Sequence, residues 1–296
     1  MKSYRKHIIN NMTSGIWLTL PEIVGAVLGL VFLPIVIFYI KQEQYGLLQF
    51  VHAIVGTISA LTFIRITKES KVYIAKGNYD VVYKAIIYRL KLFTIPLILT
   101  MISSMILIFV FEYQTIGILI ALLIWSPVFG SIIMQSLQAI CIAKEKFREW
   151  CFWELARIGT VPFLNAGLAF AFRDVVILVI GNLIWIALLS LSMILFYSRR
   201  YSLRKYYKIE NSNYNDLKLY GIKMLPVNLS VQGRNNIAEI LVGAFLGFEV
   251  LATFSIAYKK IYIRMNLLIK KITPLFYKQE VKQNITKKIL SNKSHL

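Results

Sequence analysis

The sequence has little acidic charge and almost no cysteine. It holds 14 Asp and Glu residues against 34 Lys and Arg residues, with two cysteines and three histidines in 296 residues. Two cysteines exclude a disulfide-stapled secreted domain, and without a CxxC pair or a Cys/His cluster we expect no metal site. GxSxG, Walker and HExxH motifs are also lacking. We therefore predict a protein that is not an enzyme and has no cofactor.

Charged residues of both signs are scarce as well. They make up 16% of the chain, hydrophobic residues make up 57%, and the mean hydropathy is +0.63. A soluble domain carries about 25% charged residues, so the composition excludes an ordinary soluble or disordered chain. The net charge of +20 would suggest nucleic acid in a soluble protein, but here the basic residues lie between long apolar runs. We predict an all-α integral membrane protein with no nucleic-acid partner.

Eight apolar segments are candidate membrane spans, since about 20 apolar residues cross a bilayer. They cover residues 15–40, 47–64, 92–111, 115–143, 151–172, 175–197, 224–246 and 250–269. The last two contain charged residues, which must face protein or water instead of lipid.

The loops alternate in charge. The N-terminus and the loops after the second, fourth and sixth segments hold nearly all loop Lys and Arg residues, whereas the other loops hold little beyond Lys41 and Arg173. The positive-inside rule places the N-terminus in the cytoplasm and the poorly charged loops outside. These outside loops are very short and leave no room for a soluble domain.

A weak internal repeat relates the start of the chain to its last third. Leu20-Pro21 precedes Glu43, and Leu225-Pro226 precedes Glu249, with Pro-to-Glu spacings of 22 and 23 residues. Six spans separate the copies, as in transporters whose two halves are parallel repeats. We expect a six-helix lobe over 1–210, the first two helices of a second lobe over 211–269, and a basic polar tail over 270–296.

Two segments resemble a known family. Residues 43–50 read EQYGLLQF and resemble the E-x-[YF]-G-x-[YL] signature of polysaccharide biosynthesis flippases; residues 241–260 are similar to the seventh and eighth helices of O-antigen and capsule repeat-unit flippases. These belong to the multidrug/oligosaccharidyl-lipid/polysaccharide exporter superfamily. Gly46 matches the signature, whereas Ala252 stands where glycine is usual. Members usually have twelve or more spans, so eight suggest a chain truncated at its C-terminus.

The resemblance implies a function. Such a flippase moves a polyprenyl-pyrophosphate-linked oligosaccharide across the bacterial inner membrane by alternating access, and its partners would include a polysaccharide polymerase or other assembly proteins. A multidrug exporter of the same superfamily would favour acidic cavity residues. An embedded polysaccharide polymerase would favour a long outside loop with arginines. A non-transporting remnant would account for the missing spans.

Cationic residues within spans are the candidate cargo contacts, because a lipid pyrophosphate needs positive charge in the cavity. Arg157 is the first candidate, with Glu154 one turn earlier; a plain ion pair or an arginine that reaches the interface is the alternative. The second group is Arg234, Asn235, Asn236 and Glu239, for which a polar packing seam is the alternative.

Three further residues complete the candidate set. Lys259 and Lys260 lie in the eighth segment as cargo contacts or, alternatively, as interfacial anchors. Glu22 is the carboxylate of the first segment and a candidate for ion coupling, because membrane carboxylates bind protons or Na⁺. The alternative for Glu22 is a pair with a loop lysine.

Overall fold

The computed structural model describes residues 2–59, 61, 74, 80–201, 219 and 222–258. Over these residues the chain forms helices and no strand. The helices, in chain order, are α1 (Lys2–Tyr39), α2 (Gln42–Ser59), α4 (Asp80–Phe109), α5 (Gln114–Leu123), the π-helix η2 (Val128–Met134), α6 (Gln135–Ala143), α7 (Phe147–Ile158), α8 (Thr160–Phe172), α9 (Val175–Tyr201), α11 (Leu225–Leu246) and α12 (Phe248–Ser255).

The prediction of an all-α membrane fold is confirmed. Five stretches are long and apolar enough to cross a membrane: Gly15–Tyr39, Val82–Phe109, Gln114–Ala143, Phe147–Phe172 and Val175–Arg200. They correspond to the first, third, fourth, fifth and sixth predicted segments. The second, seventh and eighth predicted segments correspond to α2, α11 and α12, which are shorter or more polar within the described residues.

Two predicted spans are each divided by a local break. Residues 115–143 form α5, η2 and α6, and the π-helix begins directly after Pro127. Residues 151–172 form α7 and α8, which meet at Gly159 three residues before Pro162. Proline lacks the N–H that would bond the carbonyl four residues earlier, which favours a break near Pro127 and near Pro162, although Pro21, Pro34 and Pro96 lie within continuous helices. Breaks of this kind redirect side chains in the middle of the bundle.

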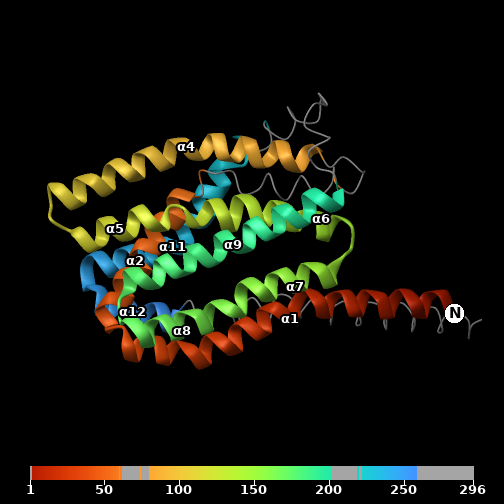
Figure 1. Cartoon of the computed structure of the whole chain (residues 1–296), viewed down its shortest axis with the longest axis horizontal. Helices are drawn as coiled ribbons and strands as arrows, with labels where there is room; N and C mark the ends of the chain where they lie inside the picture. The colour runs from red at the N-terminus through yellow and green to blue at the C-terminus, as the bar shows by residue number, and fades with distance from the viewer. Residues whose placement is uncertain are drawn as a thin grey trace, which may run out of the picture.

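The helices run between two ends of the molecule. The turns that join α1 to α2, α4 to α5, α8 to α9 and α11 to α12 lie together, at the left in Figure 1; this is called the hairpin end. The α6–α7 turn and the last turn of α9 lie at the opposite end, called the basic end, where Lys144, Lys146, Arg148, Arg199 and Arg200 are found. The predicted lobe boundary at 210 and the tail 270–296 lie outside the described residues.

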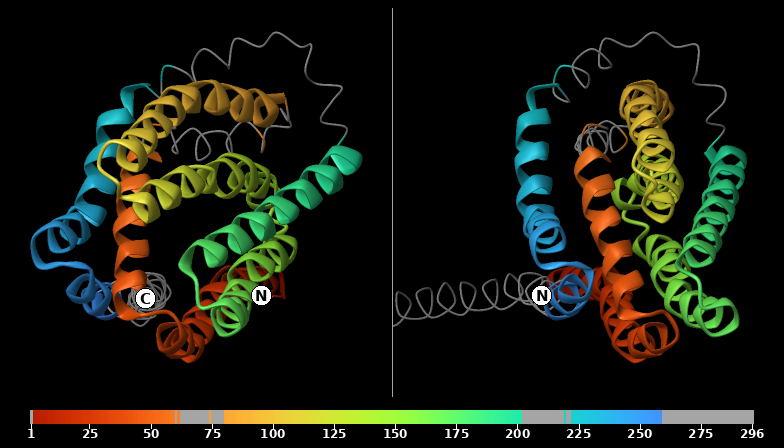
Figure 2. Two further views of the ribbon diagram at one scale, coloured as in Figure 1. Left: turned by 60° about the vertical axis from the view of Figure 1, so that its left-hand side comes forward. Right: turned by 90° about the vertical axis from the view of Figure 1, so that its left-hand side faces the viewer.

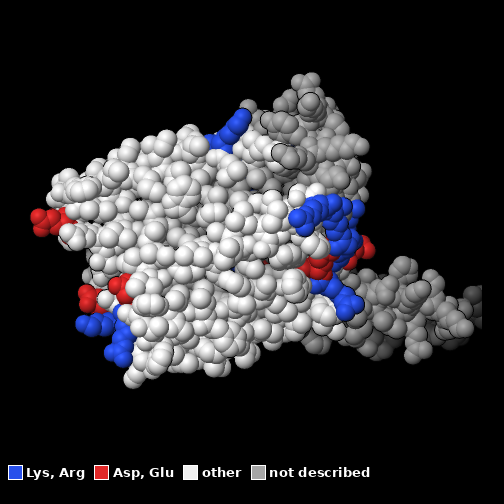
Figure 3. Space-filling model, viewed as in Figure 1, with Lys and Arg blue, Asp and Glu red and all other residues white. Residues whose placement is uncertain are grey.

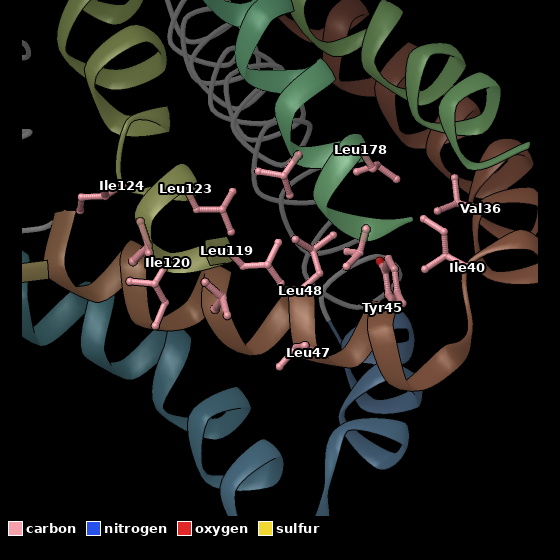
Figure 4. Packing of buried hydrophobic residues seen from close by; sticks show 14 of the residues in the cluster. Val36, Ile40, Tyr45, Leu47, Leu48, Leu119, Ile120, Leu123, Ile124 and Leu178 are labelled. Carbon is pink, nitrogen blue, oxygen red and sulfur yellow. The ribbon is translucent and has the colours of Figure 1, made fainter. Parts of the chain in front are cut away.

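The main apolar core lies where α2 meets its neighbours. Tyr45 and Leu48 of α2 pack with Leu119 of α5, Leu178 of α9 and Val36 of α1 (Figure 4). On the other side of α2 lie α11 and α12, as both views of Figure 2 show. The short helix α2 is therefore covered by other helices on several sides and is the centre of the packing.

The outer surface is apolar. Phe38, Phe109 and Phe245 are 79–82% exposed, and charged side chains lie mostly at the two ends with an uncharged belt between them (Figure 3). A water-soluble protein rarely exposes so large an apolar surface, whereas lipid tails solvate one. The described helices thus form a multi-pass membrane bundle.

Candidate functional site

A partly open cavity of about 350 Å³ lies between α1, α2, α5, α7, α8 and α9. Its walls are mainly apolar, with Phe32 and Val36 on one side and Leu178 on another. Seven polar residues line it: Tyr45, Gln49 and His52 of α2, and Ser126, Arg157, Asn165 and Asn182 from other parts of the bundle. A mostly apolar hollow with a few convergent polar groups is the usual form of a ligand site.

Arg157 supplies the guanidinium of this cavity. It is paired with Glu154, which also accepts a hydrogen bond of 2.8 Å from Gln138 Nε2. The Arg157 side chain is 38% exposed, but that of Glu154 only 9%. The ion pair that the sequence analysis gives as the alternative to a cargo contact is therefore present, and the two side chains differ in their exposure. The carboxylate is held within the protein, and the guanidinium lies at the cavity wall.

The position of Arg157 follows from the break between α7 and α8. It is the second-last residue of α7, just before Gly159, and lies ten residues from the start of that helix at the basic end. Ten residues correspond to about 15 Å of helix, which is half of a hydrocarbon core about 30 Å thick. Counted along the candidate span Phe147–Phe172, Arg157 lies nearer the middle than the end, which favours a role other than a surface anchor.

Two amides form a second polar group in the cavity. Asn182 of α9 donates a 2.6 Å hydrogen bond to the Oδ1 of Asn165 on α8. The Oδ1 of Asn182 is buried and accepts no hydrogen bond from the described residues. On α2, Gln49 and His52 are three residues apart and therefore share one helix face. Amide and imidazole groups offer both donors and acceptors to a polar ligand.

A separate polar seam joins α2 to α11 and α12. Asn236 donates to Thr57 Oγ1 at 3.2 Å, and Ser255 donates to Glu239 Oε1 at 3.1 Å. Glu239 is fully buried there. These contacts hold three helices together, as interhelical hydrogen bonds do in membranes.

The seam is tightest at the hairpin end. A Cβ atom at Gly46 would lie 1.7 Å from the backbone oxygen of Phe248, so the backbones of α2 and α12 nearly touch. Gln42 Nε2 donates to Glu249 O at 3.1 Å and to Thr253 Oγ1 at 2.9 Å. Both copies of the sequence repeat thus form helical hairpins, and the starts of their second helices pack against each other.

The predicted cluster on α11 is divided between two faces. Asn236, Glu239 and Gly243 face the seam, whereas Arg234 precedes Asn236 by two residues and therefore lies about 160° around the helix. Arg234 is exposed and lines a separate hollow with Pro226 and Ser230. The structure does not bring Arg234 to the Arg157 cavity.

The remaining candidates are placed as follows. Glu22 is half-buried on α1 and is not among the described residues that line the Arg157 cavity. The side chain of Asn235, and Lys259 and Lys260, lie outside the described part of the chain.

One buried cation could not be recognised from the sequence. Arg89 lies between the second and third predicted spans, where the charge pattern indicates a cytoplasmic loop, but α4 begins at Asp80 and Arg89 is fully buried within it. It donates to Ser131 O at 2.8 Å and to Ser131 Oγ at 3.2 Å, and lies 3.4 Å from Ser136 Oγ. Arg89 therefore supports the π-helix η2, whose carbonyls deviate from regular helical pairing.

Comparison with known proteins agrees with the architecture. The family described as Polysaccharide biosynthesis protein matches residues 12–277, which is most of the chain. No curated protein and no solved structure matches it. The matched region includes every residue that lines the cavity and the helices α2, α11 and α12 of the seam. The chain therefore belongs to the polysaccharide biosynthesis protein family.

Proposed function

We propose that this protein moves a polyprenyl-pyrophosphate-linked oligosaccharide across the bacterial inner membrane, as a transporter and without covalent chemistry. The observation that carries the proposal is Arg157, which lines a partly open cavity between the membrane helices. Membership in the polysaccharide biosynthesis family supports a carbohydrate cargo.

The charge of the cavity favours an anion. Among the described lining residues there is no Asp or Glu, and Glu154 is turned into the protein towards Gln138. A guanidinium binds phosphate through two parallel N–H groups, and does so more strongly away from water. A cation exporter, the rival in the same superfamily, would need a carboxylate where this cavity presents Arg157.

The size of the cavity indicates which part of the cargo it holds. A volume of about 350 Å³ is at the lower end of small-molecule sites. We infer that it receives the pyrophosphate and the adjoining sugar, with Asn165 and Asn182 as partners for sugar hydroxyls. The lipid tail would remain in the membrane beside the apolar outer surface.

The contact between α2 and α12 in the seam is the part of the bundle that we expect to change during transport. Because the α2 and α12 backbones nearly touch at Gly46, the described structure is closed between these helices at the hairpin end. We infer that alternating access separates α12 from α2 there. The basic residues of the opposite end support a cytoplasmic location for that end and for the N-terminus, because cytoplasmic loops collect Lys and Arg.

The test is binding of undecaprenyl pyrophosphate to the purified full chain, with uncharged undecaprenol as the comparison lipid. Arg157→Gln should weaken pyrophosphate binding tenfold or more, since hydrogen bonds to charged groups contribute about 1.5–3 kcal/mol. Arg173→Gln, at the hairpin end, is the matched control and should bind like the native chain. Equal binding of both lipids, or unchanged binding by Arg157→Gln, would reject the proposal.

A second test measures transport in cells. The gene is expressed in a strain that lacks its own repeat-unit flippase, and surface polysaccharide is assayed. The native chain and Arg173→Gln should restore polysaccharide, whereas Arg157→Gln should not. Restoration by the Arg157 variant at equal membrane abundance would show that the cavity is not the cargo path.

A further inference from the structure

An open hollow of about 610 Å³ lies on α9 at the basic end and shares no lining residue with the cavity. Its described lining residues are Ser192, Leu195, Phe196, Arg199 and Arg200. Their spacing of three, four, seven and eight residues places them on one helix face. The hollow is thus apolar towards the middle of the span and cationic where the span ends.

The two arginines differ in what they contact. Arg200 donates to Glu149 Oε2 at 3.0 Å, and its guanidinium carbon lies 5.5 Å from the centre of the Phe196 ring. Arg199 is exposed and forms no hydrogen bond or ion pair with the residues that the structure describes. One guanidinium is therefore anchored, and the other is available to a ligand.

The apolar wall is held in place by packing. Phe196 contacts Trp153 of α7 and Tyr197, with ring centroids 5.9 and 5.2 Å apart. Towards the hairpin end, the exposed Leu188 and Leu191 continue the apolar surface of α9 from Leu195. An acyl chain could lie along this surface with its phosphate at the arginines.

We propose that this hollow binds an anionic phospholipid, with the headgroup phosphate on Arg199 and one acyl chain along Leu195 and Leu191. Charge complementarity and the position at the end of a span favour a lipid, because a cationic rim above an apolar wall matches a phosphate above a hydrocarbon chain. Ser192, the smallest lining side chain, leaves room for that chain. This site does not depend on the transport function proposed above.

The experiment adds phosphatidylglycerol to the detergent-purified full chain and counts bound lipid by native mass spectrometry. Phosphatidylcholine tests the need for net negative charge, and soluble glycerol phosphate tests the need for acyl chains. Phosphatidylglycerol should bind more tightly than either probe. Arg199→Gln should weaken its binding about fivefold, as expected for one basic side chain near a membrane surface.

Two further variants test whether the lipid binds in this hollow. Ser192→Trp fills the hollow without a change of charge and should weaken binding as much as Arg199→Gln, whereas Arg173→Gln removes the same charge at the hairpin end and should have no effect. Equal binding of phosphatidylcholine, equal binding of glycerol phosphate, or native affinity in both α9 variants would overturn the proposal. If the native chain forms dimers without bound lipid, and Arg199→Gln abolishes those dimers, the hollow is a contact site for a second copy of the chain and the lipid proposal is wrong.

Discussion

The contact at Gly46 leads to a stability prediction that the structure makes specific. A single methyl group at this position would lie 1.7 Å from Phe248 O and 2.6 Å from the carbonyl carbon, where contacts under 3.0 Å are essentially never made. The clashing atoms belong to backbone and cannot rotate away. Gly46→Ala must therefore push α12 from α2 by more than an ångström.

The size of the effect follows from two opposing contributions. Overpacking of a tight contact costs about 1–3 kcal/mol. Alanine in place of glycine stabilises a helix by up to about 1 kcal/mol, which offsets part of this cost. Displacement of α12 also lengthens the hydrogen bonds from Gln42 to Glu249 and Thr253. We expect a net loss of about 2 kcal/mol in the free energy of unfolding.

Thermal unfolding of the purified protein in detergent measures this loss. At about 2–4 °C per kcal/mol for a chain of this size, the midpoint should fall by roughly 4–8 °C. Gly167→Ala is the matched control, because it adds the same methyl group to the interior of α8 with nothing within 4 Å. If both variants unfold at the native temperature, the close approach of α2 and α12 does not exist.

Three other changes test the cavity, the π-helix and the seam. Glu154→Gln should raise the affinity for undecaprenyl pyrophosphate, because Arg157 loses its counter-charge; weaker binding in the same lipid assay would contradict this. Arg89→Met should lower the free energy of unfolding by about 3 kcal/mol, since Ser131 loses charge-assisted hydrogen bonds. Lys91 is exposed on the same helix, and Lys91→Met should leave the free energy of unfolding unchanged. Asn236→Ala should cost only about 0.6 kcal/mol, the usual value of one interhelical hydrogen bond, and a loss above 2 kcal/mol would show a larger role.

The sequence predicted the features that depend on local pattern. Long apolar runs predicted eight spans, and five of the corresponding segments are long and apolar enough to cross a membrane, because a bilayer imposes their length. The pairing of Arg157 with Glu154 was also predictable, since residues three apart share a helix face. Both predictions use only neighbours in the chain.

Features that depend on tertiary contact could not be predicted. The amide pair of Asn165 and Asn182 joins residues 17 apart on two helices. Arg89 resembled a loop residue because lysines surround it in the sequence, yet acceptors 42 residues away at Ser131 allow its burial. A polar residue in an apolar stretch indicates that a tertiary hydrogen bond is present, but the sequence does not identify the residue at its other end.

The cavity and the seam are connected through α2 itself. Tyr45, Gln49 and His52 line the cavity. Tyr45 directly precedes Gly46 of the seam, and Gln49 directly precedes Phe50, whose ring lies 5.5 Å from that of Phe248 on α12. Neighbouring residues in a helix point about 100° apart, so one rigid helix presents both surfaces. A separation of α12 from α2 therefore frees the helix that carries part of the cavity wall. Any cargo that binds the closed and open arrangements differently would then shift the balance between them.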